Sequence, residues 1–203
     1  MTKPQETGYF VAISDAEVPE QYRHTFVAYR RLGIELGVRE QVPLCYRVRA
    51  GFTLKTHAPQ VGPCLDRFHD LQDAPLADKP TSNCLAFWVP RVVPGSTSKS
   101  VVAQMELLAE LRRKRGLPAH HLSSFGSAAL VAGLILAHFK ATGERVPLHS
   151  FYVVTDAQLA IGRLYLGEFD EEGLSWCSWG MKMENRGGPV IGLFPLGVEA
   201  LGD

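Results

Sequence analysis

The sequence has no net charge, no long hydrophobic run and no closely spaced cysteine pair, and each absence excludes a class of protein. Its 203 residues contain 21 Lys+Arg and 21 Asp+Glu, whereas a general nucleic-acid binder needs a basic surface. The longest apolar run, Ala128 to Ala137, has ten residues, and a membrane-spanning helix needs about 20. We therefore expect neither a nucleic-acid nor a membrane partner.

The four cysteines, at positions 45, 64, 84 and 177, include no CxxC pair. A chain of this length can bury a core without covalent cross-links, so free thiols in a reducing compartment are expected, although four cysteines allow three disulfide pairings. The first apolar stretch, residues 9–13, is too short for the hydrophobic region of a secretory signal peptide. These features predict a cytoplasmic protein.

Two helices are predicted, over about residues 99–115 and 124–142. The first has apolar residues on one face and charged residues opposite, and Gly116 ends it. The second is apolar nearly all round, with Ser123 or Ser124 as its N-cap. A helix without a polar face belongs at the centre of a fold.

Strands are predicted on both sides of these helices. Residues 84–89 have the pattern of a buried strand, and residues 51–80, rich in proline and charge, are interpreted largely as loop. Several strands follow residue 150. With no linker in the sequence, residues 1–203 are expected to form a single α+β domain: a mixed or antiparallel sheet with the two apolar helices packed on one face and a C-terminal β-meander.

A polar loop between the 84–89 strand and the following helix is the leading candidate site. Free N–H groups and the helix dipole at such a turn hold phosphate or carboxylate groups. The loop is not a Walker loop, because Ser98 stands where that pattern has a glycine before the lysine. Alternatively, Ser98 or Ser100 simply caps the helix and Gly95 makes the turn. The candidate anion-binding residues are Gly95, Ser96, Thr97, Ser98, Lys99 and Ser100, with residues 51–80 as a candidate cover.

Three histidines are candidate acid/base groups for an enzyme acting on a phosphorylated substrate: His120, His121 and His149. His120 and His121 are adjacent on a short connector, so their side chains are expected to diverge. Zinc ligands are typically two to five residues apart or share a helix face, and we therefore predict no metal site and no cofactor.

The function that the sequence favours is binding of a small anionic or phosphorylated molecule at the 95–100 loop. The enzyme described above is one alternative. The other is a non-catalytic interaction module, a homodimer for example, that uses the tryptophan-rich strand containing Trp176 and Trp179.

Overall fold

The computed structural model describes residues 8–71, 74–180 and 187–202. Within these ranges the chain forms four α-helices and eight strands in two sheets. The helices are α1 (Arg23–Glu35), α2 (Leu54–Val61), α3 (Val101–Arg115) and α4 (Ala128–Thr142). The strands are β1 (Phe10–Ala12), β2 (Cys45–Val48), β3 (Cys84–Trp88), β4 (Tyr152–Leu159), β5 (Gly162–Gly167), β6 (Ser175–Trp179), β7 (Ile191–Gly192) and β8 (Leu196–Ala200).

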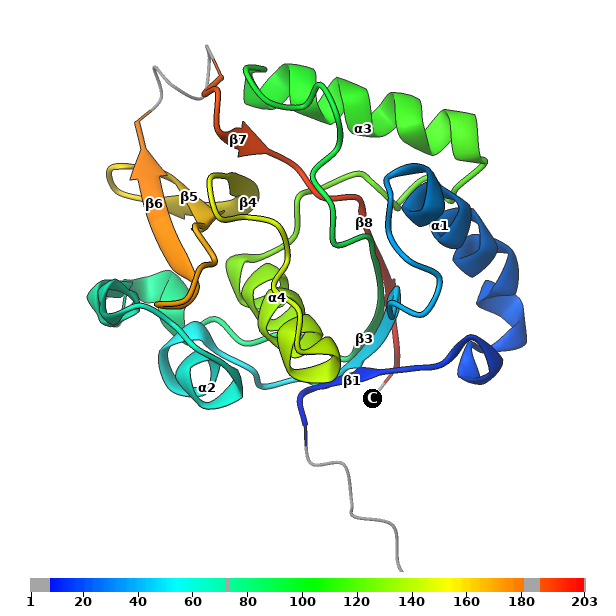
Figure 1. Ribbon diagram of the computed structural model, residues 1–203, viewed down its shortest axis with the longest axis horizontal. Helices are drawn as coiled ribbons and strands as arrows, with labels where there is room; N and C mark the ends of the chain where they lie inside the picture. The colour runs from blue at the N-terminus through cyan, green and yellow to red at the C-terminus, as the bar shows by residue number, and fades with distance from the viewer. Residues whose placement is uncertain (1–7, 72–73, 181–186, 203) are drawn as a thin grey trace, which may run out of the picture.

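The first sheet is antiparallel, with the order β1-β2-β3-β8. Side chains alternate between its faces. Ala86 and Trp88 enter the core cluster that includes α4, whereas Leu85 and Phe87 enter the cluster that includes α1. The sheet therefore lies between α4 on one side and α1 on the other, as Figure 1 shows.

The second sheet is mixed, with the order β6-β5-β4-β7. Strands β4, β5 and β6 form the antiparallel meander predicted from the sequence, and β7 adds in parallel to β4. The α+β class is confirmed, with the strands divided between two sheets. The side chain of Trp179, named above for the interaction hypothesis, lies outside the described part of the structure.

Helix α4 occupies the middle of the molecule between the two sheets (Figure 1). Its first eleven residues, 128–138, are all buried. The Ser127 hydroxyl accepts a hydrogen bond from Leu130 N, so the cap lies three residues beyond Ser124. At Gly133 an added Cβ would come closer than 3.0 Å to the Phe10 ring. The glycine therefore allows β1 to pack directly on the helix.

Helix α3 is peripheral by comparison, since only Gln104 and Leu108 are buried along it. Leu108 belongs to the cluster that includes α1, so α3 and α4 contribute to different core clusters. The Gln104 amide donates to the carbonyl oxygens of Ser96 and Ile191, at 2.9 and 3.1 Å. This buried side chain joins α3 to the loop before it and to β7.

Two elements were not anticipated. Helix α2 lies within residues 51–80, where prolines and charges favoured a loop, and its N-cap is Thr53, whose hydroxyl accepts a hydrogen bond from Thr56 N. The buried side chains of α2 join the core around α4. Strand β8 was not predicted because it contains Gly197, and glycine weakens the sequence pattern of a strand. Its backbone pairs with β3 in the first sheet.

No helix in the described ranges combines the length and apolarity needed to cross a membrane.

Candidate functional site

The loop predicted to bind an anion uses several of its polar groups to support the fold. Ser100 caps α3, with its hydroxyl accepting from Ala103 N at 3.2 Å. Ser96 is fully buried, and its hydroxyl accepts from Leu193 N at 3.3 Å. Gly95 has a φ of 71°, in the left-handed region that glycine favours. The capping and turn interpretations therefore account for Ser100 and Gly95, and Ser96 joins the loop to residue 193.

The rest of the loop packs against residues 187–188. Ser98 has a φ of 58° and donates its N–H to Gly188 O at 2.9 Å. A Cβ on Gly187 would come closer than 3.0 Å to the backbone of Lys99. Thr97 is half-buried, and the Lys99 side chain is exposed. An anion site here stays a prediction, resting on Lys99 and the N-terminus of α3.

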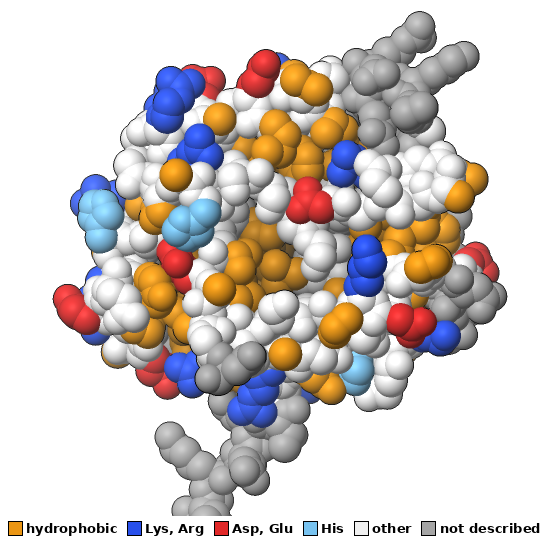
Figure 2. Space-filling model, turned by 180° about the vertical axis from the view of Figure 1, so that it is seen from behind, with side chains coloured by type: hydrophobic (Ala, Val, Ile, Leu, Met, Phe, Trp, Pro, Cys, Tyr) orange, Lys and Arg blue, Asp and Glu red, His pale blue; other side chains and the backbone are white. Residues whose placement is uncertain are grey.

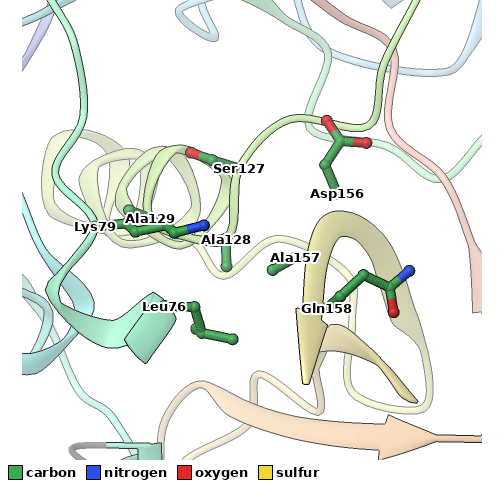
Figure 3. Close-up of a pocket in the computed structure, with 8 residues that line it drawn as sticks. All are labelled: Leu76, Lys79, Ser127, Ala128, Ala129, Asp156, Ala157 and Gln158. Carbon is green, nitrogen blue, oxygen red and sulfur yellow. The ribbon is translucent and has the colours of Figure 1, made fainter. Parts of the chain in front are cut away.

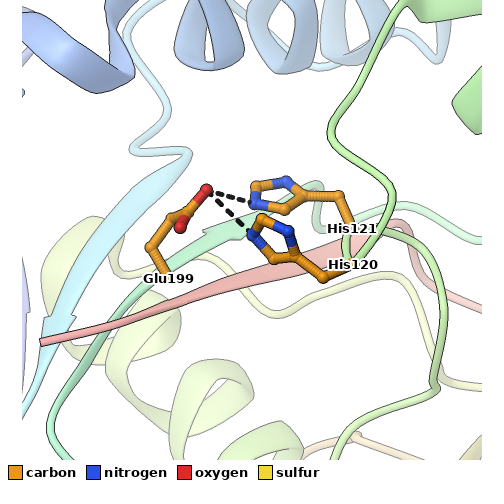
Figure 4. Close-up of side chains that lie close together, drawn as sticks. All are labelled: His120, His121 and Glu199. Carbon is orange, nitrogen blue, oxygen red and sulfur yellow. Dashed lines mark hydrogen bonds and ion pairs between the residues drawn. The ribbon is translucent and has the colours of Figure 1, made fainter.

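The structure brings His120 and His121 together with Glu199 of β8, as Figure 4 shows. The Nε2 atom of His121 lies 2.8 Å from Glu199 Oε1, and the Nε2 atom of His120 lies 3.1 Å from the same oxygen. The two rings meet edge to face with centroids 4.7 Å apart. The expectation that these side chains diverge is therefore wrong, because the connector turns both rings toward β8.

Backbone contacts on both sides of His121 hold the connector in this conformation. The Ser123 hydroxyl donates to His120 O at 2.6 Å. Leu122 takes up a left-handed φ of 50° and donates its N–H to Leu196 O at 3.1 Å. The connector is thus tied to the beginning of the strand that carries Glu199.

Burial differs sharply across this cluster. His121 is 0% exposed and lies beside the rings of Tyr29 and Phe87, with centroids 5.7 Å away in each case. The side chain of Glu199 is 15% exposed and that of His120 is 55% exposed. The cluster is therefore closed on the His121 side and open to solvent on the His120 side.

The electrostatics keep His121 neutral near pH 7. Burial lowers the pKa of His121 below its ordinary value, and the hydrogen bond to Glu199 partly opposes this effect. In the neutral ring Nε2 donates its proton to the Glu199 carboxylate, and Nε2 can bind a metal ion when the ring proton resides on Nδ1 instead.

The Tyr29 hydroxyl and the second ring nitrogen of His121 lie near each other beside Gly197. Among the described residues, the Tyr29 hydroxyl and His121 Nδ1 are both buried without a hydrogen-bond partner. A Cβ on Gly197 would come closer than 3.0 Å to both atoms, so they approach each other over this glycine. Burial, and then the charge of Glu199, raise the pKa of Tyr29 well above its ordinary value, and the phenol stays protonated. Gly197 is thus required for this arrangement.

The three ligand-type atoms have the spacing of a metal-binding group. All lie within 4.8 Å of one another. Separations of 2.8 and 3.1 Å correspond to angles of about 85° and about 100° at an ion with bonds of about 2.0–2.1 Å. Two histidines and one carboxylate are a common donor set for Zn²⁺ and Fe²⁺. The same groups can also exchange protons without a metal.

His149, the third acid/base candidate, is separate from this cluster. It is exposed, in the connection between α4 and β4. Within the described residues the ligand group consists of His120, His121 and Glu199.

A cavity of about 410 Å³ lies at the N-terminus of α4 (Figure 3). Lys79 and Asp156 provide its charged groups. The Asp156 carboxylate accepts hydrogen bonds from Phe125 N and Gly126 N, at 3.1 and 2.9 Å, and so supports the turn before α4. One face of the molecule is also hollowed at its centre, with hydrophobic side chains exposed in the hollow (Figure 2). The cavity at α4 is not lined by His120, His121 or Glu199, so it is separate from the histidine cluster.

Sequence reasoning missed Glu199 and Tyr29. Glu199 is 78 residues from His121 along the chain, and no local pattern links the two. The sequence signal that existed was the pair of adjacent histidines. No protein-family model, curated protein or solved structure matches this chain.

Proposed function

We propose that the protein binds a divalent transition-metal ion through His120 Nε2, His121 Nε2 and Glu199 Oε1. The observation that carries the proposal is the convergence of both Nε2 atoms on one carboxylate oxygen, at 2.8 and 3.1 Å. Three protein ligands leave coordination positions open for water or substrate, as in catalytic zinc and non-haem iron sites. The exposed side of His120 gives solvent access to those positions.

The surroundings of His121 support a metal ligand at this position. When Nε2 binds a metal, the ring proton resides on Nδ1, and metal-bound histidines typically donate that proton to a neighbouring acceptor. The Tyr29 hydroxyl lies near His121 Nδ1 over Gly197, and neither atom has a hydrogen-bond partner among the described residues, so the hydroxyl is available as that acceptor. Tyr29 would then orient His121 without contacting the ion.

A bound divalent ion suits reactions that need an activated water or a polarised oxygen. It lowers the pKa of bound water toward neutrality and stabilises negative charge that develops on substrate oxygens. Hydrolysis is accordingly the reaction class that we favour, and His120, at the open side, would be the ligand nearest to the substrate.

Metal titration of EDTA-treated protein tests this proposal. Calorimetry with Zn²⁺ should give one site per chain, and Co²⁺ should give a visible ligand-field spectrum. His120→Ala and Glu199→Gln should each weaken binding at least about tenfold, since the first removes one ligand and the second removes the negative charge of another. His24→Ala, which removes an exposed histidine on α1, is the matched control and should bind as the wild type does.

Two results would contradict the proposal. One is a wild-type Kd for Zn²⁺ weaker than about 1 mM. The other is equal affinity in the wild type, His120→Ala and Glu199→Gln, which would place the ion elsewhere. Because His120 is largely exposed, His120→Ala should fold normally, and its thermal unfolding without metal checks this.

Anion binding at residues 95–100, a phosphorylated substrate and homodimerisation stay predictions. Cytoplasmic location is likewise proposed, and the four cysteines, all free thiols, support a reducing compartment.

A further inference from the structure

A second cavity, of about 310 Å³, is lined by three arginines from distant parts of the chain. Arg39 follows α1, Arg91 follows β3 and Arg145 follows α4. None of them belongs to the histidine cluster. Their convergence at one cavity is a product of the fold, since more than 50 residues separate each from the next.

The cavity carries a positive charge of two. Its acidic group is Glu144, which forms an ion pair with Arg39. The Arg145 guanidinium lies over the rings of Phe139 and Phe169, 5.0 and 5.7 Å from their centroids. These aromatic contacts restrict the guanidinium without neutralising it.

His138 adds a buried polar group to the cavity wall. The residue is 4% exposed, and its Nδ1 has no hydrogen-bond partner in the described part of the chain. Burial lowers its pKa to about 4, while Glu144 opposes this effect and Arg91 adds to it. The ring is therefore neutral near pH 7 and can donate one N–H. A buried group of this kind costs stability unless a ligand or water satisfies it.

We infer that this cavity binds a small dianionic oxyanion of the phosphate-monoester class, held by Arg91 and Arg145 and by a hydrogen bond from His138. Guanidinium groups bind phosphate through paired N–H donors. A phosphate monoester carries a charge of about −1.5 to −2 at neutral pH, which balances the charge of the cavity. The volume is at the lower end for ligand pockets, which favours a small molecule over a nucleotide. This inference is independent of the proposed metal site.

Calorimetry at constant ionic strength tests the inference, with EDTA-treated protein so that no metal ion contributes. The probes are inorganic phosphate and glycerol 3-phosphate, with chloride as the reference anion. Tighter binding of glycerol 3-phosphate would identify an organic phosphate as the ligand type, and tighter binding of phosphate would identify the free ion. Arg91→Gln and Arg145→Gln should each weaken binding at least about tenfold, because each removes a charge-assisted contact.

Two controls locate the site. Arg31→Gln removes an exposed arginine on α1 that does not line the cavity, and it should bind as the wild type does. Lys99→Ala removes the cation of the 95–100 loop, and it should also bind the probes as the wild type does. The inference is overturned if binding is weaker than about 1 mM for both probes. It is also overturned if Lys99→Ala abolishes binding while the Arg91 and Arg145 variants retain it, or if all variants bind equally.

Discussion

Replacing Gly197 with alanine tests the most constrained part of the candidate site. The new Cβ would come closer than 3.0 Å to His121 Nδ1 and to the Tyr29 hydroxyl, and ordinary contacts begin at 3.4 Å. Both side chains are 0% exposed, so neither can move into solvent. Both rings, or the strand that carries residue 197, must therefore shift within a packed core.

The expected cost of Gly197→Ala combines two effects. Overpacking of a buried site costs about 1–3 kcal/mol. A shift of His121 also weakens its 2.8 Å hydrogen bond to Glu199, and hydrogen bonds to charged groups contribute about 1.5–3 kcal/mol. We expect the free energy of unfolding to fall by about 2–4 kcal/mol. For a chain of this length each kcal/mol lowers Tm by about 2–4 °C.

Urea denaturation of the wild type and of Gly197→Ala measures this difference, with an unchanged m-value as the sign of a change in stability alone. Gly202→Ala is the matched control, because an added Cβ there meets no atom within 4 Å. The steric reasoning is refuted if Gly197→Ala unfolds within about 0.5 kcal/mol of the wild type. A folded Gly197→Ala that binds Zn²⁺ with wild-type affinity would refute the orienting role of Tyr29 as well.

Three further predictions concern α4. The pKa of His138 falls from 6.5 to about 4 on folding. Between about pH 4 and pH 6.5 the unfolded chain therefore binds a proton at His138 that the folded chain does not bind. The free energy of unfolding should therefore decrease as pH falls from about 6.5 to about 4, by up to about 3 kcal/mol, and urea titrations of a His138→Phe variant should lack this component. Gly133→Ala should lower Tm, because the added Cβ would come closer than 3.0 Å to the Phe10 ring, and this clash outweighs the helix preference of alanine. An unchanged or higher Tm in thermal unfolding would contradict this. Ser127→Ala removes the cap on Leu130 N and should cost about 1 kcal/mol by chemical denaturation, whereas Ser124→Ala should cost much less.

Local sequence signals predicted much of the helical structure. Gly116 ends α3 in the left-handed conformation, with a φ of 60°, as its position predicted. The continuous apolar run of α4 predicted a central helix, and its residues 128–138 are buried. The cap of α4 is Ser127 instead of Ser123 or Ser124, because the residues before it make other hydrogen bonds. Leu122 N donates to Leu196 O at the start of β8, and Gly126 N donates to the Asp156 carboxylate.

The candidate site was only partly predictable. Ser96, Ser98 and Ser100 were candidates for anion binding, with capping by Ser98 or Ser100 as the alternative, and the structure shows capping by Ser100 and burial of Ser96. The adjacent histidines were singled out as acid/base groups, but their partner was not. Glu199 lies on a strand whose place in the sheet depends on pairing with β3.

The sequence by itself determined the α+β class, the two long helices and the terminal meander, because caps, glycines and apolar periodicity act over a few neighbouring residues. The tertiary structure alone decided how the strands divide into two sheets and which polar groups meet. Glu199 reaches His120 and His121, and Arg39, Arg91 and Arg145 reach one cavity, only after distant segments pack together. Such contacts depend on the summed burial of the whole core, so the sequence indicated the adjacent histidines but not the carboxylate that they meet.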